Sequence, residues 1–427
     1  MKVVAALNEY RQALLSLCLR FGLAALSLLV TVVLTRGLGA DQFGLYSFIL
    51  SFCLLIAGMA QAGSTPLLVR EIAVARSRRE VIRLGFFALT LVGSITAVLL
   101  LAAALLDADR FEQSPSAIVA LIGLSSGLAL TAAMIRGLHH VLLGQVGDSV
   151  LRPTALIVGI LVLGSLGARV NANQAFQVYL FSLVAALLFN LALLGVMVRR
   201  LSGEREAEPQ KTRSILRGFV GLALLGWFTT ANAQLPPYIA GYLASPAQAG
   251  FYRVAGQFAT LLLMGLTAVE IAQGPAYSRA FVMKDTGTLR TLLQTSCRFS
   301  TALAIPGGIV LMATAEPIVV VFFGADFRPA ADVIRFLALG VMVSALTGNV
   351  GTMLVGCRME RALTISAVIS LVVLAILCGL LIPSYGAIGA AIAQAASQVV
   401  RNGLNGFVAW RALGIVALPR FSLRKKR

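Results

Sequence analysis

The chain has 427 residues, of which 59% are hydrophobic and only 12% are charged, and its mean hydropathy is +0.90. Soluble globular domains carry about 25% charged residues, so this composition excludes a water-soluble protein and indicates an integral membrane protein. The net charge of +18 would suit a nucleic-acid-binding protein, but the basic residues cluster in alternate connections between apolar runs. That pattern is typical of membrane topology, and we expect no nucleic-acid partner.

Apolar runs of about 20 residues recur along the chain, the length that a helix needs to cross a bilayer. A transmembrane β-barrel would show alternating segments of about ten residues, so we predict an all-α, polytopic membrane protein. The first run is too long for a signal-peptide core and lacks a cleavage site, and we expect a retained span. Twelve spans are predicted, at 14–35, 43–63, 82–106, 117–136, 153–168, 175–198, 216–240, 250–275, 299–322, 333–356, 363–382 and 387–410.

Of the 35 basic residues, 27 lie before the first predicted span, in alternate connections such as those after the second and sixth spans, or in the C-terminal tail. Cytoplasmic loops carry such an excess of Lys and Arg, so these connections are predicted to face the cytoplasm. Both termini are then cytoplasmic, which requires an even number of spans.

A polar interval, RRLSGEREAEPQKTR at 199–213, divides the predicted spans six and six and is typical of a linker. We predict an N-terminal six-helix bundle at 1–199, a cytoplasmic linker at 200–215, and a C-terminal six-helix bundle with a basic tail at 216–427. The word QFGLY at 42–46 recurs as QAGFY at 248–252. A parallel repeat would place two pseudo-symmetric bundles around a central cavity; chance similarity is the alternative.

An arginine lies inside the first apolar run. Arg20 shares an arc of about 100° with the hydroxyl residues Ser16, Ser27, Thr31 and Thr35. An arginine in a membrane helix costs roughly 2.5 to 3.5 kcal/mol on insertion scales and usually faces a bundle interior or a cavity. We expect Arg20 to line a cavity. Because it lies near the start of its run, snorkelling to the inner surface is the alternative.

The last predicted span has the clearest polar face. One arc of about 100° on this helix holds all of its amides and its arginine: Gln394, Gln398, Arg401, Asn402 and Asn405. Arg401 lies roughly 14 Å from the inner end of the span, at about 1.5 Å per residue, which is too deep for easy snorkelling. We expect a cavity wall here; the alternative is that the amides join neighbouring helices.

Two further groups lie at the start of the second half. Arg253 and Gln257 share a face of the eighth predicted span, with Arg253 near its outer end. In the seventh, Asn232 precedes Pro236 and Pro237, which remove two backbone donors and are expected to bend or break the helix. Such a bend would be either a gate or a packing kink.

Signals of catalysis and metal binding are weak. The G-x-S-x-G match at 123–127 lies inside a predicted span without the strand that a nucleophile elbow needs. The sequence contains no phosphate-binding P-loop, and its only histidines, His139 and His140, are adjacent and lack ligand spacing. The five cysteines have no C-x-x-C spacing. We therefore predict that the protein is not an enzyme and holds neither a metal nor a cofactor.

Several segments together resemble one family. They are RGLGADQFGLYSFILS at 36–51, GSTPLLVREIA at 63–73, AGFYRVAGQ at 249–257, FFGADFRPAADVIRFLALG at 322–340 and LIPSYGAIGAAIAQ at 381–394. They resemble the polysaccharide-biosynthesis flippases, the O-antigen, capsule and exopolysaccharide repeat-unit translocases of the multidrug/oligosaccharidyl-lipid/polysaccharide exporter superfamily. The resemblance runs over nearly the full length.

The resemblance implies a V-shaped pair of six-helix bundles in the bacterial inner membrane. By alternating access, they would move an undecaprenyl-pyrophosphate-linked oligosaccharide from the inner to the outer leaflet. A polysaccharide polymerase and a chain-length regulator would be partners. Arg20, Arg401 and Arg253 would meet the pyrophosphate charge, and amides would bind sugar hydroxyls; these are Gln398, Asn402, Asn405, Asn232 and Gln257.

Other functions stay open at this point. A lipid II flippase is less favoured because such relatives often carry two extra spans. A cation-coupled drug antiporter would need a buried acid at mid-depth, for which only Glu270 is a candidate. A membrane enzyme of glycan assembly is the third alternative. The sequence leaves open the sugar, the oligomeric state, and coupling to protons, sodium or the membrane potential.

Overall fold

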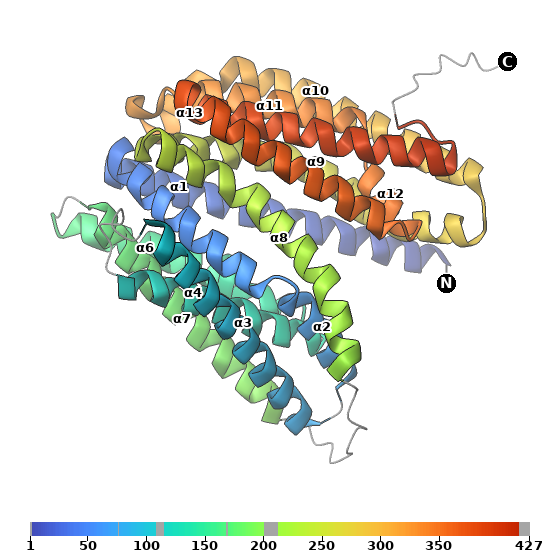
Figure 1. Ribbon diagram of the computed structural model, residues 1–427, viewed down its shortest axis with the longest axis horizontal. Helices are drawn as coiled ribbons and strands as arrows, with labels where there is room; N and C mark the ends of the chain where they lie inside the picture. The colour runs from blue at the N-terminus through green and yellow to red at the C-terminus, as the bar shows by residue number, and fades with distance from the viewer. Residues whose placement is uncertain (1, 76, 108–114, 168–169, 200–211, 418–427) are drawn as a thin grey trace. The chain divides into compact units, whose positions relative to one another are not determined.

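The computed structural model describes residues 2–75, 77–107, 115–167, 170–199 and 212–417, and within these ranges its regular elements are all helices (Figure 1). The N-terminal part holds α1 (Lys2–Gln61), α2 (Ser64–Val74), α3 (Arg78–Asp107), α4 (Pro115–Gly137), α5 (Leu143–Val146), the π-helical turn η2 (Gly147–Leu151), α6 (Arg152–Ser165) and α7 (Ala172–Arg199). The remainder holds α8 (Thr212–Leu243), α9 (Pro246–Val282), α10 (Thr286–Phe323), η3 (Ala325–Phe327), α11 (Ala330–Leu346), α12 (Val350–Gly356) and α13 (Glu360–Leu413). The prediction of an all-α membrane protein is confirmed.

Two pairs of predicted spans are joined into single long helices with a kink. The first two predicted spans lie in α1, which has non-helical backbone at Gly39 (φ 76°, ψ 176°). The last two lie in α13, kinked at Gly386 (φ 55°, ψ −133°). Positive φ is open to glycine at little cost, so these glycines replace the short connections that the sequence predicts.

Length and composition identify the membrane-spanning candidates. Among the described residues, seven helices are long and apolar enough to cross a membrane, and an eighth is the pair α11 and α12, bent by 45°. Two of the seven are the kinked α1 and α13. The structure therefore supports a polytopic protein.

The chain packs into two compact units. Unit 1 is Met1–Leu28 together with Ile239–Arg427, and unit 2 is Leu29–Tyr238. The boundaries between the two units lie inside α1 and α8 and differ from the limits of the predicted domains. Those domains, at 1–199 and 216–427 with a linker at 200–215, are defined by position in the sequence and stay a prediction.

In unit 2, α4 packs against α2, α3 and α7, around a cluster that includes Leu68, Ile72 and Ile135. Small residues set the close approaches. A Cβ added at Gly137 would lie 2.7 Å from the Cβ of Ile72, and one at Gly63 would lie 2.8 Å from the backbone nitrogen of Ala223. Lipid tails are as apolar as leucine, so membrane helices associate mainly through such close packing.

In unit 1, α9, α10 and α11 pack against one another, and α13 packs against α11 and α9 (Figure 1). The seam between α11 and α13 also depends on a small residue, because a Cβ at Gly340 would lie 2.8 Å from the Cβ of Ala395. This seam fixes the C-terminal part of α13, which carries the predicted polar face.

The two units repeat one helix-capping contact. Gln42 Oε1 accepts a hydrogen bond from the backbone N–H of Ala172, the first residue of α7, at 2.9 Å. Gln248 Oε1 accepts one from the N–H of Ala387, directly after the α13 kink, at 2.8 Å. Each glutamine thereby satisfies a donor that a helix start leaves unpaired. Both glutamines open the recurring words in the sequence, which supports an internal repeat.

Candidate functional site

The polar face of α13 follows the Gly386 kink. Gln394 and Asn405 are buried, with 8% and 3% of their surface exposed, whereas Gln398, Arg401 and Asn402 are half-buried. Asn402 Nδ2 donates to Ser344 Oγ of α11 at 2.5 Å. Along this face, therefore, the centre is partly accessible and the ends are packed.

Asn405 is used in packing within α13. Its Oδ1 accepts a hydrogen bond from Ser366 Oγ, which lies before the kink, at 2.6 Å. The contact joins the two segments of the kinked helix, which is the helix-joining role that the sequence left as the alternative. A role for Asn405 in binding substrate stays a prediction, as it does for Gln398, Arg401 and Asn402.

The predicted polar faces of the first and eighth spans meet in unit 1. Ser27 Oγ of α1 donates to Gln257 Oε1 of α9 at 3.2 Å. Arg253 lies in the same helix as Gln257 and is half-buried. Arg20 belongs to α1 and Glu270 to α9, but their side chains lie outside the described residues. The described part of the site thus has its polar groups on α1, α9 and α13 of one unit.

Asn232, Pro236 and Pro237 lie in the part of α8 that belongs to unit 2. Asn232 is half-buried and both prolines are buried. The helix runs from Thr212 to Leu243 without interruption, so a break at the prolines is not observed. Membrane helices tolerate proline because neighbouring groups satisfy the freed carbonyls. A gating role for the prolines stays a prediction.

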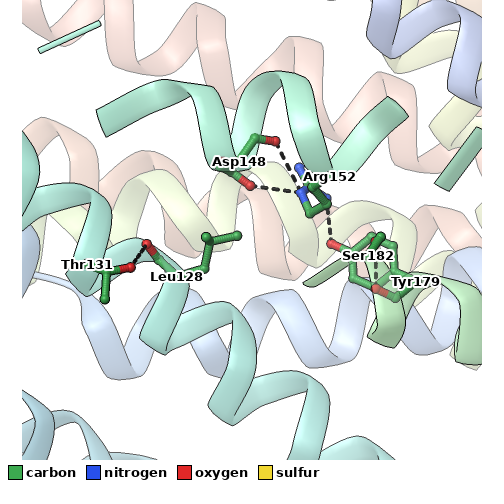
Figure 2. Close-up of polar contacts among 6 residues, drawn as sticks. All are labelled: Leu128, Thr131, Asp148, Arg152, Tyr179 and Ser182. Atoms are coloured by element: carbon green, nitrogen blue, oxygen red, sulfur yellow. Dashed lines mark hydrogen bonds and ion pairs between the residues drawn. The ribbon is translucent and has the colours of Figure 1, made fainter. Parts of the chain in front are cut away.

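A second polar group, in unit 2, surrounds Arg152 (Figure 2). Its Nε lies 2.8 Å from Asp148 Oδ1, and its Nη1 donates to the hydroxyl of Tyr179 at 2.7 Å. The guanidinium carbon also lies 5.4 Å from the centre of the Tyr179 ring, a cation–π distance. Asp148 belongs to the π-helical turn η2. Such turns are rare and occur frequently at functional sites.

This group borders a pocket of about 280 Å³ formed by α1, α4, α5, η2, α6 and α7. Its polar lining comes from Gln61, Ser125, Arg136, Gln145, Asp148, Ser149, Arg152 and Tyr179. Leucine and alanine side chains complete the wall. The pocket therefore combines two arginines, one carboxylate and several neutral hydrogen-bonding groups in a membrane-helix bundle.

This pocket is not among the sites predicted from the sequence, because the predicted fifth span begins at 153 and leaves Arg152 in a connection. That boundary is wrong: helical structure runs continuously from Leu143 through η2 to Ser165. Asp148 and Arg152 stand four positions apart and form an ion pair, a spacing that favours helix. This pair was the signal available in the sequence.

Fold and site together define a class. Long apolar helices carry arginines and amides at their packed faces. This arrangement is typical of a membrane transporter. A model of the polysaccharide biosynthesis protein family matches residues 11–281, more than half of the chain, and the chain belongs to this family. A model of the lipid II flippase MurJ matches residues 147–424. No curated protein matches the sequence.

Solved structures with a similar fold are also transporters. An inward-facing multidrug resistance MATE family transporter of the MOP superfamily has a TM-score of 0.67 and 15% identity, over 92% of this chain and 94% of that one. The lipid II flippase MurJ, in an inward closed conformation, has a TM-score of 0.64 and 13% identity, over 91% and 86%. A MOP superfamily transporter from Pyrococcus furiosus, described as having a binding pocket of reverse polarity, has a TM-score of 0.61 and 14% identity, over 94% and 93%.

These matches confirm the predicted flippase family and the polytopic helical fold. The matched families and structures are flippases and transporters rather than catalysts. The chain is therefore a member of a flippase family, and it has the fold of transporters of the MOP superfamily.

Proposed function

We propose that the protein flips an undecaprenyl-pyrophosphate-linked oligosaccharide, a polysaccharide repeat unit, from the inner to the outer leaflet of the bacterial cytoplasmic membrane by alternating access. The observation that carries the proposal is the group of Gln398, Arg401 and Asn402, half-buried on α13 of a chain in the polysaccharide biosynthesis protein family. Both termini would be cytoplasmic.

The chemistry of this substrate fits that group. A pyrophosphate carries negative charge into a region of low dielectric constant, where an unpaired charge is very costly. An arginine meets it with charge-assisted hydrogen bonds, which are about twice as strong as neutral ones. The amides of Gln398 and Asn402 supply donors and acceptors that suit sugar hydroxyls. Arg253 and Arg20 would add charge from α9 and α1.

The first alternative is a lipid II flippase, because the MurJ model matches residues 147–424. Lipid II also carries a pyrophosphate, so the proposed contacts would serve both substrates. The second alternative is a cation-coupled drug antiporter, which we consider because the fold is similar to that of a multidrug resistance MATE family transporter. An arginine on the α13 face disfavours a cationic substrate through like-charge repulsion.

Energy coupling and partners are part of the proposal. Coupling to a proton gradient, a sodium gradient or the membrane potential would supply the driving force, and collapsing each gradient separately in vesicles would identify it. A polysaccharide polymerase and a chain-length regulator would use the flipped repeat units.

The test is a deletion strain that is complemented with the wild-type gene. We expect lipid-linked repeat units to accumulate on the inner leaflet of the deletion strain and to disappear on complementation. Accumulation of lipid II instead would favour the first alternative. Normal amounts of surface polysaccharide and lipid-linked intermediates in the deletion strain would overturn the proposal.

A further inference from the structure

The pocket in unit 2 shares no residue with the α13 face, and the proposed function does not use it. All of its lining residues belong to Leu29–Tyr238. Its volume of about 280 Å³ is far larger than the roughly 30 Å³ that a water molecule occupies in the liquid. The pocket therefore has room for a small polar ligand.

The charges around the pocket leave one cation uncompensated. Asp148 and Arg152 form an ion pair at 2.8 Å and offset one another. Arg136 is half-buried and has no acidic partner within 4 Å among the residues that the structure describes. Its Nε donates to the backbone oxygen of Ala132 at 3.3 Å. The guanidinium thus lines the pocket with a net positive charge.

The helix packing positions Arg136. A Cβ added at Gly144 of α5 would lie 2.7 Å from Arg136 Cγ and 2.8 Å from the backbone oxygen of Ala132. Glycine at this position lets α5 lie directly against the stem of the arginine, which reduces the freedom of its side chain. The π-helical turn η2 follows and carries Asp148 and Ser149 along the pocket wall.

We propose that this pocket is a second anion site, which binds a phosphate or pyrophosphate group. Arg136 would be the charged ligand, and Gln61, Gln145 and Ser149 would donate hydrogen bonds. Arg152 would act as a positioning residue, because Asp148 and Tyr179 already hold its guanidinium. The anion would be either free in solution or the headgroup of a lipid.

The test measures access to the pocket in the full-length protein in nanodiscs. A Ser125→Cys variant places a thiol in the pocket wall at a position outside the proposed anion ligands, and its rate of modification by a soluble thiol reagent is followed with and without inorganic pyrophosphate. The parent protein without this change gives the background from the native cysteines. A second arm replaces inorganic pyrophosphate with a polyprenyl pyrophosphate incorporated in the nanodisc.

We expect pyrophosphate to slow the modification at least five-fold. Adding Arg136→Gln should remove the protection, and Arg136→Lys should retain part of it. The matched control, Arg79→Gln, changes an exposed arginine at the start of α3 and should leave the protection unchanged. Protection by the lipid alone would assign the site to a headgroup, and protection by inorganic pyrophosphate would assign it to a free anion.

Two results would overturn this site: no protection in either arm, or equal protection in the Arg136→Gln variant. Neither result bears on the proposed flippase function, because Arg136 is not part of the α13 face. Conversely, if the deletion strain disproved the flippase function, the protection of the pocket by pyrophosphate would still stand.

Discussion

Helix α7 of unit 2 and the C-terminal part of α13 in unit 1 follow the same plan, but only one of them carries a charged face. Counted from their capped residues, Ala172 and Ala387, each helix has a buried serine and then a buried asparagine at the same positions. These are Ser182 and Asn190 in α7, and Ser397 and Asn405 in α13. The capping glutamine, the serine and the asparagine therefore belong to a shared scaffold.

The difference lies between the shared residues. Where α13 has Gln398, Arg401 and Asn402, the same count in α7 reaches Leu183, Ala186 and Leu187. Scaffold positions are retained in both units, whereas the half-buried polar positions occur in one. The comparison therefore assigns two roles to the polar face predicted from the sequence. Asn405 stabilises packing, and Gln398, Arg401 and Asn402 are the candidates for substrate binding.

The largest effect is expected at Arg401. Arg401→Ala should abolish transport while leaving membrane insertion intact, and Arg401→Lys should retain part of the activity, because charge matters more than guanidinium geometry. Surface polymer and inner-leaflet intermediates in complemented deletion cells provide the measurement. Arg411→Ala, which changes an exposed arginine at the end of α13, is the control. Wild-type polymer levels with Arg401→Ala would exclude this residue from the site.

Alanine substitutions at the two kink glycines, Gly39 and Gly386, should lower stability by different amounts. Both combine positive φ with an extended ψ, a backbone region that is nearly restricted to glycine and costs other residues about 1 to 3 kcal/mol. At Gly386 a Cβ would also lie 2.6 Å from Gln248 Oε1, whereas at Gly39 nothing lies within 4 Å. Gly386→Ala should therefore lower the thermal unfolding temperature in detergent more than Gly39→Ala does. Equal shifts would mean that the Gln248 cap yields without cost.

The shared asparagines should matter for stability in both units. Asn405→Ala leaves Ser366 Oγ without this partner, and Asn190→Ala removes the 3.4 Å contact with Thr131 Oγ1. Ser366 Oγ and Thr131 Oγ1 each keep a hydrogen bond to a backbone oxygen of their own helix. Each variant should therefore lose about 0.5 to 1.5 kcal/mol, and the shorter Asn405 contact should cost more. Thermal unfolding measures the loss. If Asn405→Ala reduced transport more than the lower amount of protein explains, Asn405 would belong to the substrate site.

The capping glutamines should have smaller effects of similar size. Gln42→Ala and Gln248→Ala each leave one backbone donor at a helix start unpaired. By analogy with side-chain N-caps, each should cost about 1 kcal/mol. Hydrogen exchange at Ala172 and Ala387 should become faster in the corresponding variant only. Unchanged exchange in both variants would contradict the shared capping role.

The smallest effect concerns two helix caps that differ in charge, an exposed aspartate and a half-buried serine. The hydrogen bonds that Asp285 accepts from the side chain and the backbone N–H of Thr288 hold its pKa below the usual value, whereas Ser77 accepts from the N–H of Glu80 without titrating. A lowered carboxyl pKa adds stability above the unfolded pKa of about 3.9, and this is lost as pH falls through the folded value.

Thermal unfolding at pH 7 and pH 3 should therefore show that Asp285→Ala destabilises more at the higher pH. Ser77→Ala should have the same effect at both. If Asp285→Ala lowered the unfolding temperature equally at both pH values, the carboxylate charge of Asp285 would contribute nothing to the cap.

The sequence by itself determined the class of protein, because bilayer thickness fixes the length of an apolar span; the count of twelve spans and their orientation stay predictions. It also placed Gln398, Arg401 and Asn402 on one face, since helical periodicity needs no knowledge of neighbours. Tertiary structure decided which polar residue contacts which helix. Asn405 meets Ser366, and Arg152 lies between Asp148 and Tyr179, because partners far apart in the chain come together only through packing.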